Sequence, residues 1–489
     1  MEHNRKLGRK TTSFIVKCLG IIFFSSASWA QVDNAVISSP IIDLSPEQTE
    51  VSESGARQKI AQSDLKSRTI RGLRHVRFDT DSIKENVFNK PTPKPIELRL
   101  FRDAVVTVVT ESVTHDVRGL YHWYGHLSTS PWHRVVILVD VDNKFMVGTI
   151  QSERWVYDIR PIGKNAHEIL KIDPTQFPSE IHVPYKKNRR FGQMTPFLPQ
   201  DLSGLILPVS NGGNCITFLV AYTTSAKDAV GGTTIIEMQI SNAVDSINDS
   251  FYQSGITHRV YLVHTGELSY AGFPAQDLGT VLLDDILNAP PGSALSPLKA
   301  WREQYKADVV SLWVEDTTNP QPACAVGYLT GASFTFDPPN PLDYKDSAYS
   351  VVVRLCAQSN KSFAHELGHM MGALHDRVTE QNFDVMKDNF GHCIPSSGGH
   401  TGTIMAKADG CPVLTRLWAW SNPSKFYPAP NNTLRMGQFK GQTGAADNHR
   451  VFNDVTGSLV AGFQSPTDSA CPGSGDTQAP VPPANLRVQ

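Results

Sequence analysis

One stretch of twelve residues, 365–376, constrains this chain more than any other. It reads HELGHMMGALHD, so histidines stand at positions 365, 369 and 375. Residues four apart lie on one face of a helix, and His365 and His369 can therefore hold one metal ion. Three imidazoles and a water molecule are the open coordination of a catalytic zinc ion, whereas structural zinc sites are closed by four protein ligands. We therefore predict that His365, His369 and His375 bind one catalytic zinc ion.

Two further residues of this stretch complete the predicted chemistry, on a helix expected over 361–374. Glu366 directly follows the first histidine, where its carboxylate can take a proton from a metal-bound water molecule. Gly372 allows the backbone to leave the helix in the left-handed conformation, so that the chain can turn and bring the last histidine to the metal. The short HExxH pattern arises by chance in many helices, but the added glycine and histidine at fixed spacing leave little room for accident. We therefore favour a site with Glu366 as general base over a purely structural role.

The first thirty residues, 1–30, have the layout of a secretory signal. Basic residues between Arg5 and Lys17 precede the short apolar run 19–24, and small residues follow up to Ala30, after which we expect cleavage. A membrane anchor is the alternative, but this run is far shorter than the roughly 20 residues that a membrane span needs. No later stretch is long enough either. We therefore predict a secreted protein without a membrane span.

Composition indicates which classes of partner are excluded and whether the cysteines are oxidised. The chain of 489 residues has room for two or three domains, and its formal net charge of -2 gives no broad basic surface, which argues against nucleic acid as a partner. Once Cys18 leaves with the signal, six cysteines remain, an even number that favours disulfides in a secreted chain. Sequence leaves their pairing open. We expect Cys393 to pair with Cys411, because the two bracket the segment after the metal-binding helix.

The region 31–205 is expected to be a β-rich domain followed by a linker. Its first part, to about residue 75, is polar and irregular, whereas short apolar runs separated by Gly and polar turns fill 96–150. Such runs are typical of an antiparallel β domain. The basic run 184–190 and the Pro- and Gly-rich residues after it indicate a linker. A basic run is usually a solvated surface, but it can also be where a protease separates a pro-segment, and we favour that interpretation.

The region 206–465 is expected to be an α/β domain. Buried strands are predicted at 216–222, 259–263 and 307–314, and apolar residues at helical spacing predict a helix over 236–251. Alternating strands and helices imply a mostly parallel sheet flanked by helices.

The remaining region, 466–489, is rich in Gly and Pro. Its sequence from 476 onward resembles the opening of a fibronectin type III domain. The region is too short to fold on its own as such a domain.

Other histidines give no second metal site. His122, His126 and His133 lie close together in the β-rich region, but their spacing fits no ligand helix, and we expect turn or core roles. His392 and His400 follow the metal-binding helix without a ligand at helical spacing, and we expect them to face solvent. A Ser/His/Asp hydrolase has no support, because no GxSxG motif is present.

The full HExxHxxGxxHD pattern resembles that of the metzincin metallopeptidases. An aspartate directly after the third histidine, here Asp376, makes the pattern similar to that of the reprolysin or adamalysin branch. Metzincins have a tight methionine turn beneath the metal, which residues 403–406 (TIMA) fit. Residues 420–424 (WSNPS) and 447–450 (DNHR) look like bacterial reprolysin-like enzymes, which include the peptidyl-Asp metallopeptidases. The resemblance covers about residues 215–465. More loosely, the β-rich region looks like the pro-region of the same enzymes.

This resemblance implies a metzincin-type catalytic domain, with an α+β or α/β architecture of a mostly parallel twisted sheet, an active-site helix and a methionine turn, preceded by a β-rich pro-domain. It implies that the three histidines bind zinc and that Glu366 is general base and acid. Met405 would form the floor of the site without touching the metal, and Asp376 would orient backbone or a ligand. A calcium ion is a further candidate that no residue pattern tests.

Two departures from the family are expected to matter. Astacin-like metzincins carry a tyrosine ligand two residues after the methionine, where this chain has Lys407, so that turn supplies no further ligand. Several metzincins are kept latent by a thiolate on the zinc, but residues 31–214 contain no cysteine. Cys215 could play that part, although a disulfide is the favoured interpretation. A pro-region would then block the cleft by its shape.

The function that follows is a secreted zinc endopeptidase made as a pro-enzyme, acting on proteins or peptides. An extended peptide could pair with an edge strand near 325–329, across the metal. One alternative is a secreted binding or adhesion protein that keeps the zinc fold without catalysis. Another is a metzincin of narrow specificity, acting on one target protein.

Overall fold

The computed structural model describes residues 39–43, 69–163, 165–178, 180, 215–270, 282–315, 323–328, 346–380, 388–396, 399–407, 410–411, 414–427 and 434–464. All of them belong to one compact unit, which runs from 36 to 489. The predicted signal, the basic run of the linker and the predicted tail lie outside the described residues. Among the helices in the described ranges, none is long and apolar enough to cross a membrane.

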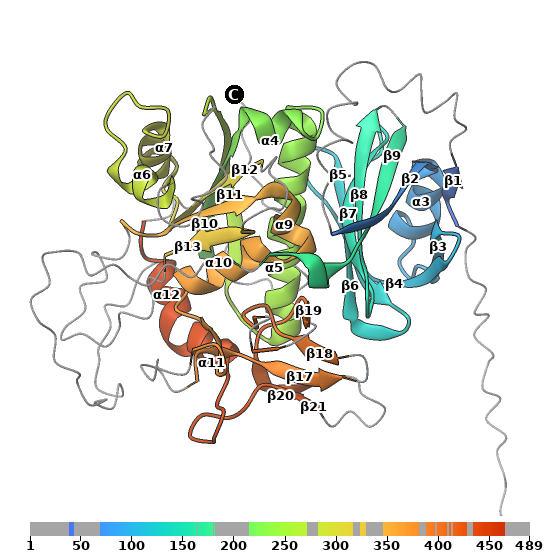
Figure 1. Ribbon diagram of the computed structural model, residues 1–489. Helices are drawn as coiled ribbons and strands as arrows, with labels where there is room; N and C mark the ends of the chain where they lie inside the picture. Colours follow the sequence, from blue (N-terminus) through green and yellow to red (C-terminus); the bar gives the residue numbers. More distant parts are fainter. Residues whose placement is uncertain are drawn as a thin grey trace, which may run out of the picture. The chain divides into compact units, whose positions relative to one another are not determined.

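An antiparallel sheet of nine strands occupies the first part of the chain (Figure 1). Its order is β1-β2-β9-β8-β7-β6-β5-β4-β3, so that from β3 to β9 each strand pairs with the next one in sequence. The predicted antiparallel strands are confirmed. The elements are β1 (Ile41–Asp43), β2 (Ile70–Phe78), α3 (Thr80–Ile83), η1 (Lys84–Phe88), β3 (Ile96–Phe101), β4 (Ala104–His115), β5 (Leu120–Leu127), β6 (Ser130–Asp140), β7 (Phe145–Gln151), β8 (Val156–Gly163), β9 (Ala166–Ile172) and η2 (Pro174–Gln176).

Strands β1 and β2 show that the expectation of irregular structure up to about residue 75 is wrong at residues 41–43 and from residue 70 onward. Strand β2 is the longer of the two. The strand contains Arg71, Arg74, His75 and Arg77, and most of its side chains are only half-buried. Its sequence therefore lacks the apolar alternation that marks a strand. Its backbone pairs with β9 on one side and with β1 on the other. Pairing with neighbouring strands, rather than side-chain pattern, decides the structure here.

The two faces of this sheet have different partners. Ile137 of β6 points into a core that includes Ile83 of α3. Leu138, the next residue, packs instead with Met238 of α5 (Thr233–Ser254). Because successive side chains of a strand point to opposite faces, both faces are buried, and β6 therefore has a continuous apolar sequence.

The second sheet is mostly parallel, as the alternation of elements predicted. Its order is β11-β10-β12-β14-β13, in which the first four strands are parallel and the edge strand β13 is antiparallel to β14. Its strands are β10 (Cys215–Thr223), β11 (Arg259–Leu268), β12 (Val309–Val314), β13 (Ala325–Gly327) and β14 (Tyr349–Val353).

Helices cover both faces of the second sheet. Phe218 and Val220 of β10 pack in one core with residues of α5, α10 and α12. Leu219 and Ala221, on the opposite face, pack with α6 and α7. The helices of this part are α4 (Thr224–Asp228), α5, α6 (Leu283–Asn288), α7 (Pro297–Tyr305), α9 (Arg354–Ser359), α10 (Ser362–Met370), α11 (Asn448–Val451), η6 (Phe452–Thr456) and α12 (Gly457–Val460).

Between α10 and α11 the described chain forms only short strands and turns. The strands are β15 (Leu374–Asp376), β16 (Phe390–Gly391), β17 (Cys393–Ser396), β18 (Gly399–Gly402), β19 (Leu414–Arg416), β20 (Asn422–Tyr427) and β21 (Leu434–Met436). The predicted disulfide between Cys393 and Cys411 is confirmed, and another joins Cys324 to Cys356. Cys215 is also disulfide-bonded, so the favoured interpretation of this residue holds over a free thiolate.

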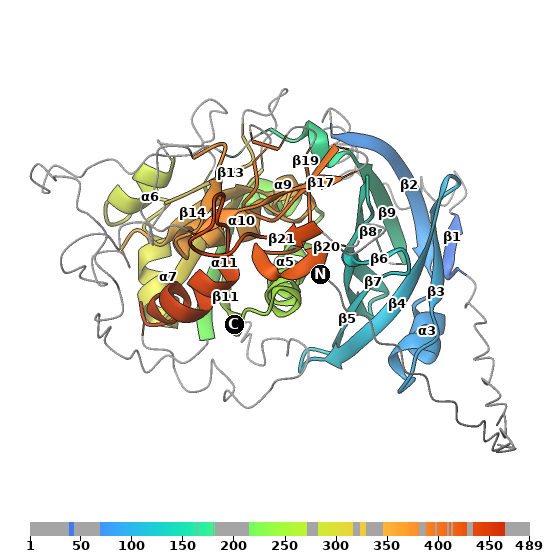
Figure 2. The ribbon, with the colours of Figure 1, turned by 90° about the horizontal axis from the view of Figure 1, so that it is seen from below.

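Helix α5 contacts both sheets (Figure 2), and its contacts with the antiparallel sheet include charged side chains. Asp249 accepts hydrogen bonds of 2.6 and 2.7 Å from the guanidinium of Arg134 on β6. Four residues earlier, one carboxylate oxygen of Asp245 lies 2.6 Å from Nδ1 of His122 on β5. All four side chains are buried. The two parts of the chain are therefore joined by buried ionic contacts as well as by apolar packing.

Candidate metal centre and active site

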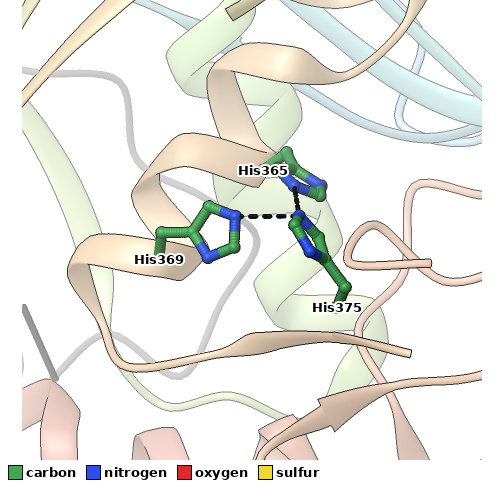
Figure 3. A group of neighbouring side chains, drawn as sticks. All are labelled: His365, His369 and His375. Atoms are coloured by element: carbon green, nitrogen blue, oxygen red, sulfur yellow. Dashed lines mark hydrogen bonds between the residues drawn. The ribbon is translucent and has the colours of Figure 1, made fainter. Parts of the chain in front are cut away.

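The three predicted ligands converge on one point (Figure 3). The Nε2 atoms of His369 and His375 are 3.1 Å apart, as are those of His375 and His365. All three side chains are buried. Within the described part of the chain they form a group whose ring nitrogens are close enough together to share a metal ion.

The hydrogen bonds of the Nδ1 atoms determine the tautomers of His365 and His369. Nδ1 of His365 donates to the carbonyl of Ile404, and Nδ1 of His369 donates to the carbonyl of Ala373, each at 2.9 Å. A carbonyl oxygen only accepts, so these Nδ1 atoms carry the proton and the Nε2 atoms present lone pairs. Burial also lowers the pKa of His365 to about 4, which keeps it neutral. Converging lone pairs repel unless a cation lies between them, so the site fits a zinc ion.

The turn at the end of helix α10 places His375 beside the two histidines of the helix. Gly372 has φ +85°, the left-handed conformation that its position predicted. The amide of Ala373 donates to the carbonyl of Gly368 at 2.8 Å, and that of Gly372 donates to His369 at 2.9 Å, which is the Schellman pattern of helix termination. The helix therefore ends at Met370, four residues before the predicted end. The chain reverses at the glycine and enters β15, which carries His375.

A tight turn lies under the histidines at 403–406. The amide of Ala406 donates to the carbonyl of Thr403 at 2.9 Å, and Met405 inside the turn is fully buried. A Cβ atom on Gly368 of α10 would come 2.4 Å from Sδ of Met405. The helix can therefore pack this closely on the turn only because residue 368 is glycine. The sequence singled out the methionine but not this glycine.

Asp376 connects the third histidine to that turn. Its carboxylate accepts hydrogen bonds from the amides of Val378 and Thr379, each at 3.1 Å, and from the amide of Lys407 at 2.9 Å. The aspartate thus orients backbone on both sides of the site. Lys407 contributes its amide to this arrangement, directly after the turn that contains Met405.

Glu380 belongs to the site although the sequence analysis did not identify it. Its Oε1 accepts the Nδ1 hydrogen of His375 at 2.5 Å. The only sequence signal is a carboxylate five residues after the last histidine of the motif. Two residues five positions apart can come into contact at any turn of the chain. This spacing alone therefore does not predict that Glu380 contacts His375.

Glu366 is buried with neither carboxylate oxygen hydrogen-bonded to a described residue. It faces the edge strand β13, because a Cβ atom on Gly327 would lie 2.6 Å from its Oε2. Burial raises the pKa of this carboxyl well above its usual range, and the nearby Glu180 adds to the rise. A raised pKa makes a carboxylate a stronger proton acceptor, as a general base requires.

The other histidines lie outside this centre. His122 and His133 are buried in the antiparallel part, in agreement with the expected core roles. His392, expected to face solvent, is instead half-buried between β16 and β17, and burial lowers its pKa.

Comparison with known proteins agrees with this geometry. Residues 213–421 match the reprolysin model of the metallo-peptidase family M12. A peptidyl-Asp metalloendopeptidase of Xanthomonas campestris is 25% identical over 386 residues, which cover 76% of this chain and 82% of the relative. One of Stenotrophomonas maltophilia is 27% identical over 331 residues, 67% of this chain and 70% of the relative. One of Pseudomonas aeruginosa is 26% identical over 275 residues, 55% of this chain and 43% of the relative. The three histidines, Glu366 and Met405 all lie inside the matched segment, which is similar to the reprolysin metallopeptidases, and the chain is a zinc metalloendopeptidase.

Proposed function

We propose that the chain is a secreted endopeptidase, made as a pro-enzyme, that cuts peptide bonds next to acidic residues. His365, His369 and His375 are the proposed zinc ligands and Glu366 the proposed general base. The observation that carries the proposal is the convergence of three Nε2 lone pairs beside a buried carboxylate that has no hydrogen-bond partner among the described residues.

The chemistry divides between the metal and the protein. Zinc, when bound, lowers the pKa of a water molecule and polarises the scissile carbonyl. Glu366 takes the proton of the attacking water and returns it to the leaving amine. The carbonyls of Ile404 and Ala373 and the carboxylate of Glu380 hold the imidazoles in orientation.

The edge strand β13 is the proposed place for the substrate backbone. It pairs with β14 on one side, and Gly327 at its end adjoins Glu366. A peptide added to the other side would run past this carboxylate, held by main-chain hydrogen bonds. A glycine at residue 327 leaves the space that such an approach needs.

Two observations support secretion and processing. The described disulfides are typical of proteins in oxidising compartments, and the sequence of residues 1–30 has the layout expected of a secretory signal. The antiparallel part is proposed as the pro-domain and the linker as the place of cleavage. The names of the relatives, peptidyl-Asp metalloendopeptidases, support a preference for aspartate.

A non-catalytic zinc-fold protein is the rival class, and Glu366 argues against it. A buried carboxylate without hydrogen bonds costs on the order of several kcal/mol. A binding or adhesion protein has no function for such a carboxylate that would offset this cost. An enzyme of narrow specificity has the same site, and only its substrates distinguish it.

The test is a peptide-library digest with zinc analysis, comparing wild-type protein with Glu366→Gln. We expect both proteins to bind zinc and only the wild type to cut. If the secreted, zinc-loaded wild-type protein cuts no peptide beyond those that the variant also cuts, the endopeptidase proposal fails. A mass measurement on the active protein checks processing, since an active enzyme that retains residues 31–200 in covalent linkage would contradict the pro-enzyme.

A further inference from the structure

A carboxylate from the antiparallel part lies buried among residues of the catalytic part. Glu180 follows η2 and is 3% exposed. Its two oxygens pair with the two terminal nitrogens of Arg416, at 2.5 and 2.8 Å. Asn360 Nδ2 and Ser362 Oγ also donate to its Oε1, at 2.9 and 3.0 Å. Four donors from three later residues therefore surround one carboxylate.

The four donors all come from the catalytic part, although Gln151 of β7 also donates a hydrogen bond of 2.6 Å to the backbone carbonyl of Arg416. Arg416 ends β19, and its guanidinium also donates to the carbonyls of Ala406, at 2.8 Å, and Asn360, at 3.2 Å. These bonds fix the plane of the guanidinium with two nitrogens directed at the carboxylate, the bidentate geometry that distinguishes carboxylates from amides. Lys361 adjoins it with φ +63°, and its buried ammonium lies 5.3 Å from the centre of the Trp418 ring.

The position of this carboxylate relative to the metal centre is informative. Ser362 begins helix α10 one turn before His365, and a helical turn advances about 5.4 Å. Ala406, which anchors Arg416, directly follows Met405. A side chain bound here would therefore come from a substrate residue close to the scissile bond.

We propose that Arg416, Asn360 and Ser362 form the subsite for the acidic side chain of the substrate, and that Glu180 occupies it in the uncleaved chain. The inference rests on the endopeptidase function proposed above and names the residues that would give it an acidic preference. An acidic substrate must displace Glu180, which is tethered and therefore competes at a high effective concentration. Removal of the segment that carries Glu180 leaves the guanidinium of Arg416 without its carboxylate partner, which an acidic side chain of the substrate can replace.

The first experiment measures specificity in the secreted enzyme. Two peptides are compared that differ only in an Asp or an Asn beside the scissile bond, and the ratio of their kcat/KM values is determined. Arg416→Gln should reduce the preference for Asp by about 100-fold or more, because a buried bidentate site is lost. Ser362→Ala and Asn360→Ala, which remove one donor each and perturb folding less, should reduce it by about 10-fold. An unchanged ratio in these two folded variants would overturn the proposal.

The second experiment measures occupancy in the uncleaved chain. Glu180→Gln should increase cleavage of the Asp peptide by lowering its KM, with kcat little changed. Glu111→Gln is the matched control, because Glu111 also pairs with an arginine, Arg134, but lies elsewhere. Equal activation by both variants would mean that a loosened antiparallel part, not a vacated subsite, is responsible, and would overturn the role of Glu180.

The two proposals fail in different ways. If Glu366→Gln and wild type are equally inactive on every peptide, the endopeptidase function itself is wrong. If wild type cuts peptides and Glu366→Gln does not, but the Asp/Asn ratio is independent of Arg416, Asn360 and Ser362, only the subsite is wrong.

Discussion

The Nδ1 hydrogen of His375 is donated to Oε1 of Glu380 at 2.5 Å, and both side chains are buried. The other two proposed ligands donate to backbone carbonyls, which cannot be changed by substitution. Glu380 is therefore the one acceptor of the described triad that mutagenesis can remove. A carboxylate in this place also makes the imidazole a better donor of its Nε2 lone pair.

Glu380→Ala is expected to weaken zinc binding by about 10- to 100-fold, since His375 loses the partner that orients it and raises its basicity. Glu380→Gln keeps an acceptor oxygen but no charge and should lose less. Competition with a zinc-binding dye measures both affinities, with the melting temperature as a check on folding. Equal zinc affinity in wild type and folded Glu380→Ala would show that the hydrogen bond does not tune the site.

Gly327→Ala is expected to reduce kcat while zinc binding is retained. The added methyl group would lie 2.6 Å from Oε2 of Glu366, so the carboxylate must move away from its place. A displacement of about 1 Å in a catalytic group can cost about 100-fold in rate. Steady-state kinetics and zinc content on the same sample test this. A variant with normal kcat would mean that Glu366 is not the base in the position described.

Gly368→Ala is expected to act on stability and zinc affinity instead. Alanine favours a helix over glycine by about 1 kcal/mol. Here, however, its methyl group would lie 2.4 Å from Sδ of Met405 and 2.8 Å from the ring of Trp420. Overpacking of this kind typically costs about 1–3 kcal/mol and would displace the turn that holds His365. Thermal unfolding measures the net effect, and a raised melting temperature would show that helix propensity prevails over the packing described.

Local sequence patterns predicted the parts of the site that local geometry governs. The spacing of His365 and His369 on a helix and the left-handed conformation of Gly372 follow from the backbone alone. The predicted strands of the second sheet likewise follow from apolar runs with buried faces. Helix α10 is shorter than predicted because the helix-ending hydrogen bonds involve Gly368 and His369, which a periodic pattern does not reveal.

Contacts between distant segments could not be predicted in this way. Glu180 and Arg416 are 236 residues apart, and neither belongs to a motif. Gly327 and Glu366 meet because β13 forms the edge of a sheet beside α10, which depends on strand order. Sequence periodicity identifies which face of an element is buried but not which other element covers it.

The contact between His122 and α5 predicts a dependence of stability on pH. Burial alone would lower the pKa of this histidine, but Asp245 and Asp116 outweigh it and raise the pKa from 6.5 to about 9. The protonated form is thus favoured by the fold. Its contribution is complete below pH 6.5 and is lost as the pH rises through about 9. Since one pKa unit corresponds to 1.36 kcal/mol, the contribution is on the order of 3 kcal/mol.

His122→Gln tests this directly, because glutamine keeps polarity without a titrating charge. The melting temperature of the uncleaved chain should be lower in the variant than in wild type at pH 6, and the two should approach each other towards pH 10. Asp245→Asn removes a main cause of the raised pKa and should flatten the wild-type decline over the same range. A difference between wild type and His122→Gln that stays constant from pH 6 to pH 10 would mean that His122 is neutral in the folded chain, and the contact with α5 would then be an ordinary hydrogen bond.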